Sequence, residues 1–138
     1  MANTIRFELV TPERSVVSED VEYLGAPGVN GEFGVLPNHI PFLSALGVGS
    51  LFFKSGGRRY YVFVAGGFAE ISPDKVTVLA EVAEKAEEID VERARKARER
   101  AEKRLQQAQD RQEHARARAA LFRAMQRVTT RETASQSR

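Results

Sequence analysis

The stretch ISPDKVTVLAEVAEKAEEIDVERARKARER (Ile71–Arg100) contains the point at which the chain changes character. All ten glycines and all five prolines of the 138 residues lie between Pro12 and Pro73, and neither type occurs after Pro73. Glycine and proline separate short elements with turns, whereas a long segment without them favours a continuous helix. The sequence therefore predicts a turn-rich, strand-forming part followed by a helical arm.

The part before this boundary has the alternation of half-buried β-strands. Ile5, Phe7 and Leu9 fall on one face of an extended segment. Further strand-like runs, most of them bounded by Gly, Pro, Asn or Asp, are Val21–Ala26, Phe33–Leu36, Val48–Lys54, Arg59–Ala65, Phe68–Ser72 and Lys75–Val82. Short strands that recur about every ten residues are typical of an antiparallel sandwich or flattened barrel. We expect residues 1–86 to fold as this β-domain without help from the arm.

The arm is built from the best helix formers. Ala, Arg, Glu, Gln and Lys dominate residues 90–128. Asp90 is a natural N-cap, and Asp110 followed by Glu113 resembles a capping box at a second start. We predict two helices, about 91–107 and about 111–128, folded as an antiparallel hairpin over residues 87–128. The polar residues 129–138 carry no apolar stripe, and we expect a disordered tail there.

The apolar stripe of the arm is thin. It consists mainly of alanines, namely Ala94, Ala97, Ala101, Ala108, Ala115 and Ala119, together with Leu105, Phe122 and Met125. A buried methyl group removes little area from water at about 25 cal/mol per Å². The two helices are therefore expected to separate, or to swing away from the β-domain, at a cost of only a few kcal/mol.

Charge and composition limit the function classes. Residues 1–86 carry seven Lys or Arg against ten Asp or Glu, whereas residues 87–138 carry fourteen against nine. The head is acidic and the arm is basic. The chain has no cysteine, and it lacks both a secretory signal pattern and an apolar run near the roughly 20 residues of a membrane span. We expect a soluble protein that reaches a membrane only through a partner.

Catalytic and metal-binding patterns are missing from the sequence. His39 and His114 lie in different parts of the chain and have no companions at ligand spacing. The glycines of GVNGEFG (Gly28–Gly34) match neither a dinucleotide-binding nor a phosphate-loop spacing, and they are typical of tight turns. We therefore expect a protein that is not an enzyme and holds no metal.

Four arginines offer a binding site at the base of the arm. Arg93 and Arg100 share a helix face, as do Arg123 and Arg127, and a hairpin would bring the two pairs to one end. Fork-shaped guanidinium groups suit a polyphosphate, and Asp90 and Glu84 would accept hydrogen bonds from a sugar or base. The alternative is that these arginines belong to a solvated, salt-bridged helix surface.

Two segments resemble a known family. GVNGEFGVLPNHIPFLSALGVGSL (Gly28–Leu51) and GGFAEISPDKVTVLAEVAEKAEEID (Gly66–Asp90), with the RA that follows, are similar to the epsilon subunit of the bacterial F-type proton-translocating ATP synthase. The resemblance implies a ten-stranded antiparallel β-sandwich and a two-helix hairpin. It also implies a rotor subunit of the central stalk, which couples proton flow to ATP synthesis as a peripheral protein on the cytoplasmic face of the inner membrane.

The resemblance further implies a regulatory nucleotide site. The family's ATP motif, Ile/Leu-Asp-x-x-Arg-Ala, matches Ile89, Asp90, Arg93 and Ala94, and the remaining ATP-binding positions correspond to Glu84, Arg100, Arg123 and Arg127. ATP would be a regulatory ligand rather than a required cofactor. Without it, the arm would extend along gamma toward the alpha and beta subunits and inhibit ATP hydrolysis.

The same resemblance assigns two interface residues in the sandwich. It places Glu32 at the c-ring and His39 near gamma.

Two other functions would explain parts of the sequence. A nucleic-acid-binding arm accounts for the arginines, although acidic residues are interleaved and only Phe122 would stack on a base. A coiled-coil adaptor accounts for the stripe, although alanines are poor knobs and no strict heptad of large residues persists.

Overall fold

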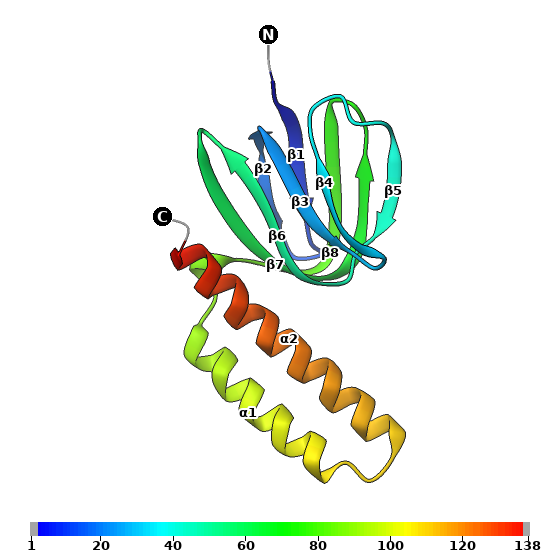
Figure 1. Cartoon of the computed structure of the whole chain (residues 1–138), viewed down its shortest axis with the longest axis vertical. Helices are drawn as coiled ribbons and strands as arrows, with labels where there is room; N and C mark the ends of the chain where they lie inside the picture. The colour runs from blue at the N-terminus through cyan, green and yellow to red at the C-terminus, as the bar shows by residue number, and fades with distance from the viewer. Residues whose placement is uncertain (1–2, 137–138) are drawn as a thin grey trace.

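Eight strands precede two helices in a computed structural model that describes residues 3–136 (Figure 1). In chain order the elements are β1 (Ile5–Val10), β2 (Ser15–Val21), β3 (Tyr23–Gly28), β4 (Gly31–Val35), β5 (Phe42–Ala45), β6 (Val48–Ser55), β7 (Arg58–Ile71), β8 (Lys75–Lys85), the 3₁₀ turn η1 (Ala86–Glu88), α1 (Val91–Gln107) and α2 (Arg111–Gln136). The predicted order of a β-domain followed by two helices is confirmed.

The strands form one hydrogen-bonded system folded into a sandwich. Its order is β2-β1-β8-β7-β6-β3-β4, and β5 pairs with β7. All pairings are antiparallel except that of β1 with β8, which is parallel. The expectation of a purely antiparallel sandwich is therefore wrong at this one pair, because β1 and β8 are distant in the chain and need no hairpin between them.

The expected count of ten strands is also wrong, since the described residues contain eight. The runs predicted separately at 59–65 and 68–72 belong to the single strand β7. Its first half pairs with β6 and its second half with β5. Gly66 and Gly67, with φ values of 74° and 117°, bend the strand without ending it. One continuous strand therefore serves both sides of the sandwich.

The core lies between the two sides of the sandwich. Alternate residues of the strands point inward, and Phe7, Leu9, Leu51 and Val64 are completely buried. The rings of Phe7 and Phe53 meet edge to face with centroids 5.4 Å apart. This core accounts for a β-domain that is held by its own contacts.

Both predicted helix caps are present. The Asp90 carboxylate accepts a hydrogen bond from the Arg93 amide at 3.1 Å. Asp110 accepts from the Glu113 amide at 2.8 Å, and Glu113 accepts in return from the Gln109 amide at 3.0 Å. These bonds fix where α1 and α2 begin.

The second helix ends later than predicted. It continues to Gln136, so the expectation of a disordered tail is wrong for residues 129–136, and residues 137–138 lie outside the described part. Thr130 is fully buried, and its hydroxyl lies 2.5 Å from that of Ser50 in β6. The helix continues because its last turns contact the β-domain, which local hydropathy does not reveal.

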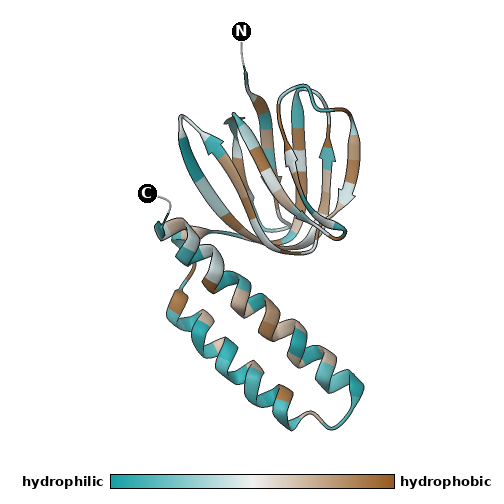
Figure 2. Ribbon diagram, in the orientation of Figure 1, coloured by the Kyte–Doolittle hydropathy of each residue, from teal (hydrophilic) through white to brown (hydrophobic). Residues whose placement is uncertain are grey.

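The helix pair is attached to the sandwich through α2. Its C-terminal half packs against β6, β7 and η1, whereas α1 packs on α2 and, within residues 3–136, has no comparable contact with a strand. Figure 2 shows that both helices are largely hydrophilic, with isolated apolar positions along each. The predicted stripe is confirmed in α1, where Ala94 and Ala101 are buried. It is wrong in α2, because Ala115, Ala119, Phe122 and Met125 are exposed and the helix buries Ala117, Ala124, Val128 and Thr130 instead.

Gly67→Ala is expected to lower the free energy of unfolding sharply. The residue has a φ of 117°, and an added Cβ would overlap the carbonyl oxygen of Leu79 on β8. Backbone strain of about 1–3 kcal/mol and an overpacking cost of about 1–3 kcal/mol should add. Gly57→Ala is the control, because its φ of 78° is also positive but no atom lies within 4 Å of the new Cβ. Urea unfolding of both variants is the measurement, and equal losses would contradict the clash.

Candidate functional site

A cavity of about 370 Å³ lies where the end of β8 and η1 meet the helix pair. Seven of the eight nucleotide-site residues predicted from the sequence line it, and Glu88 and Ala97 complete the lining. The seven are Glu84, Ile89, Asp90, Arg93, Ala94, Arg100 and Arg127. Arg123 is half-buried on α2 and does not line this cavity. The fold thus brings together residues that are up to 43 positions apart.

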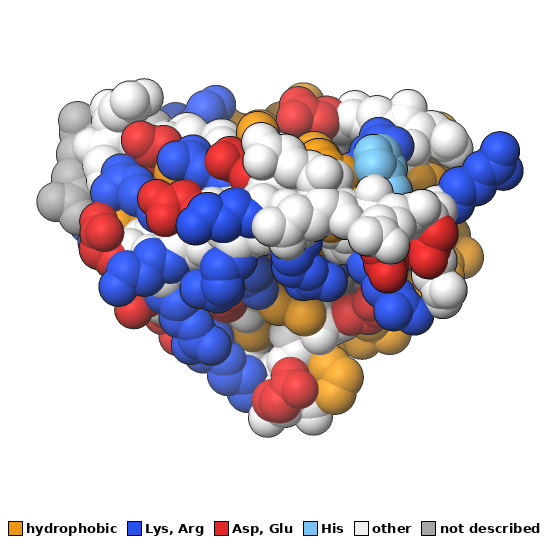
Figure 3. Space-filling view, turned by 90° about the horizontal axis from the view of Figure 1, so that it is seen from below, with side chains coloured by type: hydrophobic (Ala, Val, Ile, Leu, Met, Phe, Trp, Pro, Cys, Tyr) orange, Lys and Arg blue, Asp and Glu red, His pale blue; other side chains and the backbone are white. Residues whose placement is uncertain are grey.

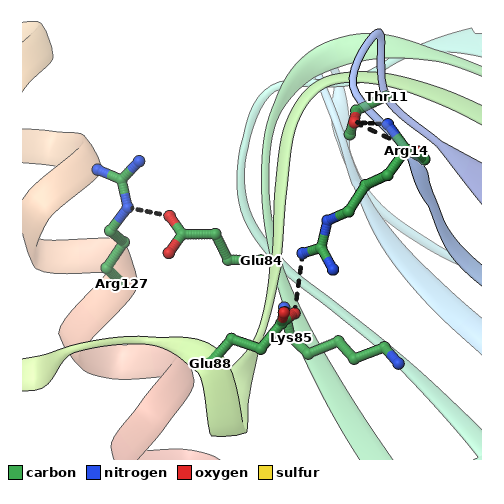
Figure 4. A network of polar contacts seen from close by, with 6 residues as sticks. All are labelled: Thr11, Arg14, Glu84, Lys85, Glu88 and Arg127. Carbon is green, nitrogen blue, oxygen red and sulfur yellow. Dashed lines mark hydrogen bonds and ion pairs between the residues drawn. The ribbon is translucent and has the colours of Figure 1, made fainter.

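Arg127 is held by two contacts on the floor of the cavity. Its Nε donates to Oε1 of Glu84 at 2.6 Å, and its guanidinium carbon lies 4.5 Å from the centroid of the buried Phe63 ring. Both partners of the ion pair are about one-third exposed, at 29% and 32%. Figure 4 shows the two side chains pointing at each other across the gap between α2 and β8. Arg127 is therefore oriented before any ligand arrives.

Ile89 and Ala94 have structural roles beside the cavity. Ile89 is buried with Phe63 and Ala65 in a small cluster apart from the main core. Ala94 is buried in the first turn of α1. These two positions hold the start of α1 in place. Asp90 has one carboxylate oxygen committed to the helix cap.

Arg93 and Arg100 are the available cations. Both are exposed residues of α1 that face the cavity, and within residues 3–136 neither takes part in an ion pair within 4.0 Å. Three arginines and three carboxylates line the cavity, and the pairs of Glu84 with Arg127 and of Glu88 with Arg14 involve one of these arginines and two of these carboxylates. The geometry offers unpaired guanidinium donors for an anionic ligand next to carboxylates that accept hydrogen bonds.

A second ion pair fixes the rim of the cavity. Arg14, in the turn between β1 and β2, donates from Nη2 to Oε1 of Glu88 at 2.9 Å, and the Lys85 amide donates to the same oxygen at 3.1 Å. Thr11 bonds to the backbone of Arg14 and shapes the turn that carries it (Figure 4). The hydrogen bond from Arg14 is the main cause that lowers the pKa of Glu88.

The sequence did not identify Glu88, Arg14 or Phe63 as members of this region. Glu88 belongs to an acidic run in which nothing distinguishes it from Glu87. Arg14 lies 74 positions from its partner, and Phe63 is one of several strand phenylalanines. No local signal would have found them, because their roles depend on the pairing of distant segments.

The two predicted interface residues lie far from the cavity in the sequence, around β4. Glu32 is exposed near the start of β4, opposite Pro27 of β3. His39 is half-buried, with Nδ1 2.7 Å from the carbonyl oxygen of Ile40 and its ring 5.5 Å from that of Phe42. Large apolar side chains are exposed in the same part of the chain, namely Val29, Leu36, Ile40 and Leu43. Such exposure is typical of a contact surface for another protein.

Within residues 3–136, no three His, Cys, Asp or Glu side chains are grouped so that they could hold a metal ion. None of the helices in the described part combines the length and apolar character that crossing a membrane requires.

Comparison with protein families identifies both parts of the chain. Residues 4–86 match the β-sandwich domain of the ATP synthase delta/epsilon chain, and residues 87–131 match its long α-helix domain. An ATP synthase epsilon chain of Nitratidesulfovibrio vulgaris (strain Hildenborough) is 59% identical over 131 residues, which are 95% of this chain and 98% of that protein. One from Maridesulfovibrio salexigens is 61% identical over 137 residues, covering 99% and 96%.

A solved structure resembles the whole chain. It is a chain of the Euglena gracilis mitochondrial ATP synthase, seen in an assembly of OSCP, F1 and c-ring. The TM-score is 0.80 at 25% identity, and the match covers 99% of this chain and 83% of that one.

Arg14→Met is expected to raise the pKa of Glu88 toward its ordinary value, because the main hydrogen bond to the carboxylate is lost. A carboxylate whose folded pKa is lowered stabilises the fold above its unfolded pKa, and this contribution disappears as pH falls through the folded pKa. The free energy of unfolding of the variant should therefore fall less steeply than that of the unchanged protein as the pH is lowered. NMR titration of the Glu88 carboxyl checks the shift.

Arg6→Met is the control for this titration. Arg6 pairs with Glu8 rather than with Glu88. A Glu88 pKa that moves equally in both variants would contradict the assignment to Arg14.

Proposed function

We propose, since this chain belongs to the ATP synthase delta/epsilon family, that it works in the central stalk of an F-type ATP synthase and that its helical arm responds to ATP. It is a stalk subunit without catalytic activity of its own, and catalysis lies in the complex. The proposal has three parts: a nucleotide site, a surface that joins the rotor, and an arm that moves between them.

The nucleotide site is the cavity between β8, η1 and the helix pair. The observation that carries it is that Arg93 and Arg100, which form no ion pair within residues 3–136, face the same cavity that Arg127 enters from α2. Three arginines on one cavity suit the phosphates of ATP, which guanidinium groups bind with two parallel hydrogen bonds each. Asp90, and Glu84 while it remains paired with Arg127, accept hydrogen bonds from the sugar or the base, and ATP acts as a regulatory ligand.

The helices form an antiparallel hairpin in this docked state. Leu105 near the end of α1 and His114 near the beginning of α2 line one cavity, whereas Arg100 and Arg127 line another. ATP, by contacting arginines of both helices, favours the closed hairpin over a separated one. Arg123 joins the phosphate site by a change of side-chain rotamer or remains a solvated surface residue.

The rotor surface lies on the sandwich. Glu32 contacts the c-ring and His39 lies near gamma, in a region where Ile40 and Leu43 are 74% and 67% exposed. Apolar side chains this exposed are stabilised by burial against another subunit. This contact holds the protein on the cytoplasmic face of the bacterial membrane without a membrane segment of its own.

The arm reaches the catalytic subunits when it is released. Figure 3, seen from the end where the helices lie, shows Lys and Arg side chains gathered over much of this surface. A basic arm is attracted to acidic surfaces of the alpha and beta subunits, most strongly at low salt. In that extended position it opposes rotation in the direction of ATP hydrolysis.

ATP is expected to increase the protection of residues 91–128 from hydrogen exchange in the isolated protein. Arg93→Ala and Arg100→Ala should each weaken this effect about tenfold, as loss of a charged hydrogen-bonding partner costs roughly 1.5–3 kcal/mol. The measurement is hydrogen exchange read by mass spectrometry across an ATP titration. Arg95→Ala is the matched control, because Arg95 lies in the same turns of α1 but pairs with Glu92 outside the cavity. Protection that does not change up to millimolar ATP would exclude the nucleotide site.

Deletion of residues 88–138 is expected to leave the complex assembled and coupled while its ATP hydrolysis rises. The reason is that the rotor surface lies within the sandwich, whereas the inhibitory element is the arm. Hydrolysis and proton pumping by membranes that carry the deletion provide the measurement. Failure of the complex to assemble would place the essential contacts in the arm and contradict this division.

A further inference from the structure

The last turns of α2 make a separate set of contacts with the sandwich, outside the nucleotide cavity. Ala124, Val128 and Thr130 are the buried residues of this half of the helix. α2 packs against β6, β7 and η1, and Thr130 contacts Ser50 of β6 directly. The attachment of the whole arm therefore depends on the end of the second helix, far along the chain from the connection that begins at η1.

A pair of hydroxyl groups lies at the centre of this contact. Thr130 donates to the carbonyl oxygen of Gln126 at 2.8 Å, and its Oγ1 lies 2.5 Å from Oγ of Ser50. Because the Thr130 proton is used within the helix, Ser50 is the donor in the bond between the two side chains. Thr130 is 0% exposed, so no water replaces the bond from Ser50 when the Ser50 hydroxyl is removed, and removal of the Thr130 hydroxyl takes this acceptor away from the half-buried Ser50.

The next residue ties the same helix turn to η1. Arg131 donates from Nη1 to the carbonyl oxygen of Ala86 at 2.9 Å. Arg127, Thr130 and Arg131 share one helix face at spacings of three and four residues. Through these three side chains a single turn of α2 bonds to β8, β6 and η1.

We propose that Thr130 and Arg131, bonded to Ser50 and to the Ala86 carbonyl, form a C-terminal latch that keeps the arm docked when no nucleotide is bound. None of these four residues lines the nucleotide cavity. Without ligand, the latch sets the ratio of docked to released molecules. ATP then shifts a ratio that already favours the docked arm. This regulation goes beyond the proposed nucleotide site and does not require it.

The latch also prepares the nucleotide site. Docking of α2 places Arg127 beside Glu84 and opposite α1, so the cavity is assembled before ligand binds. The apparent affinity of a ligand is its intrinsic affinity multiplied by the fraction of molecules in the competent state. A weaker latch should therefore weaken nucleotide binding without any change in the cavity itself.

The test measures arm position in the full chain without nucleotide. The sequence has no cysteine, so cysteines introduced at the exposed residues Glu70 of β7 and Gln112 of α2 carry spin labels at defined places. Pulsed electron paramagnetic resonance then gives the distribution of distances between sandwich and arm. A docked arm gives one narrow distance, and a released arm gives a broad one.

Three substitutions separate the hydroxyl bond from other effects. Thr130→Val keeps the shape and removes the hydroxyl, and it should lower the ratio of docked to released molecules about threefold to tenfold. Thr130→Ser restores the hydroxyl and should recover much of that loss. Thr129→Val is the matched control, because Thr129 is an exposed neighbour, and it should leave the distances unchanged.

Two further variants complete the test. Ser50→Ala should release the arm as Thr130→Val does. The variant with both substitutions should release little more of the arm than either alone, because both substitutions remove the same bond between the two side chains. Arg131→Met should release the arm independently. Distances that stay narrow in Thr130→Val and Arg131→Met would overturn the latch. Because no ATP is present, this result is distinct from failure of the nucleotide titration.

Discussion

Packing of the end of α2 against β6, β7 and η1 determines how the rest of the arm is arranged. α1 rests on α2 rather than on the sheet, so its position follows from that of the second helix. The cavity at the base of the arm exists only while this packing lasts, because Arg127 belongs to α2 and the other lining residues belong to β8, η1, α1 and the link between η1 and α1. A small interface thus controls both the shape of the protein and its candidate site.

The interface is well suited to reversible docking. It buries alanine, valine and threonine, which contribute little apolar area, and it relies on a few specific polar bonds. The sandwich, by contrast, encloses phenylalanine, leucine and valine in a continuous core. The two parts therefore differ in stability for a physical reason. In the function proposed above, the sandwich remains attached to the rotor and the arm moves when a ligand or a partner changes the balance between docked and released states.

Local patterns predicted much of this structure. The order of strands and helices, the caps at Asp90 and Asp110, and the cavity arginines Arg93, Arg100 and Arg127 follow from features that act over a few residues. Ile89 and Ala94 were implied by the family resemblance. The runs 59–65 and 68–72 were predicted as two strands because glycines usually end a strand, whereas Gly66 and Gly67 only bend β7. The ten strands implied by the family resemblance are eight in the described residues. The predicted end of α2 was wrong because the polar residues 129–136 are helical. Contacts with β6 and η1 hold them in the helix, and their own hydropathy does not indicate these contacts.

The sequence by itself determined that a strand-forming head precedes a basic helical arm, and that arginines gather where the arm begins. Period, capping and charge are local properties, so they can be read from the chain directly. Only the tertiary structure decided which arginines are neutralised and which remain available. Arg14 pairs with Glu88 across 74 positions and Arg127 with Glu84 across 43. Arg93 and Arg100 face the cavity and form no ion pair in the part of the chain that the structure describes. Such pairings depend on how distant segments meet in space, which local hydropathy and residue spacing do not predict.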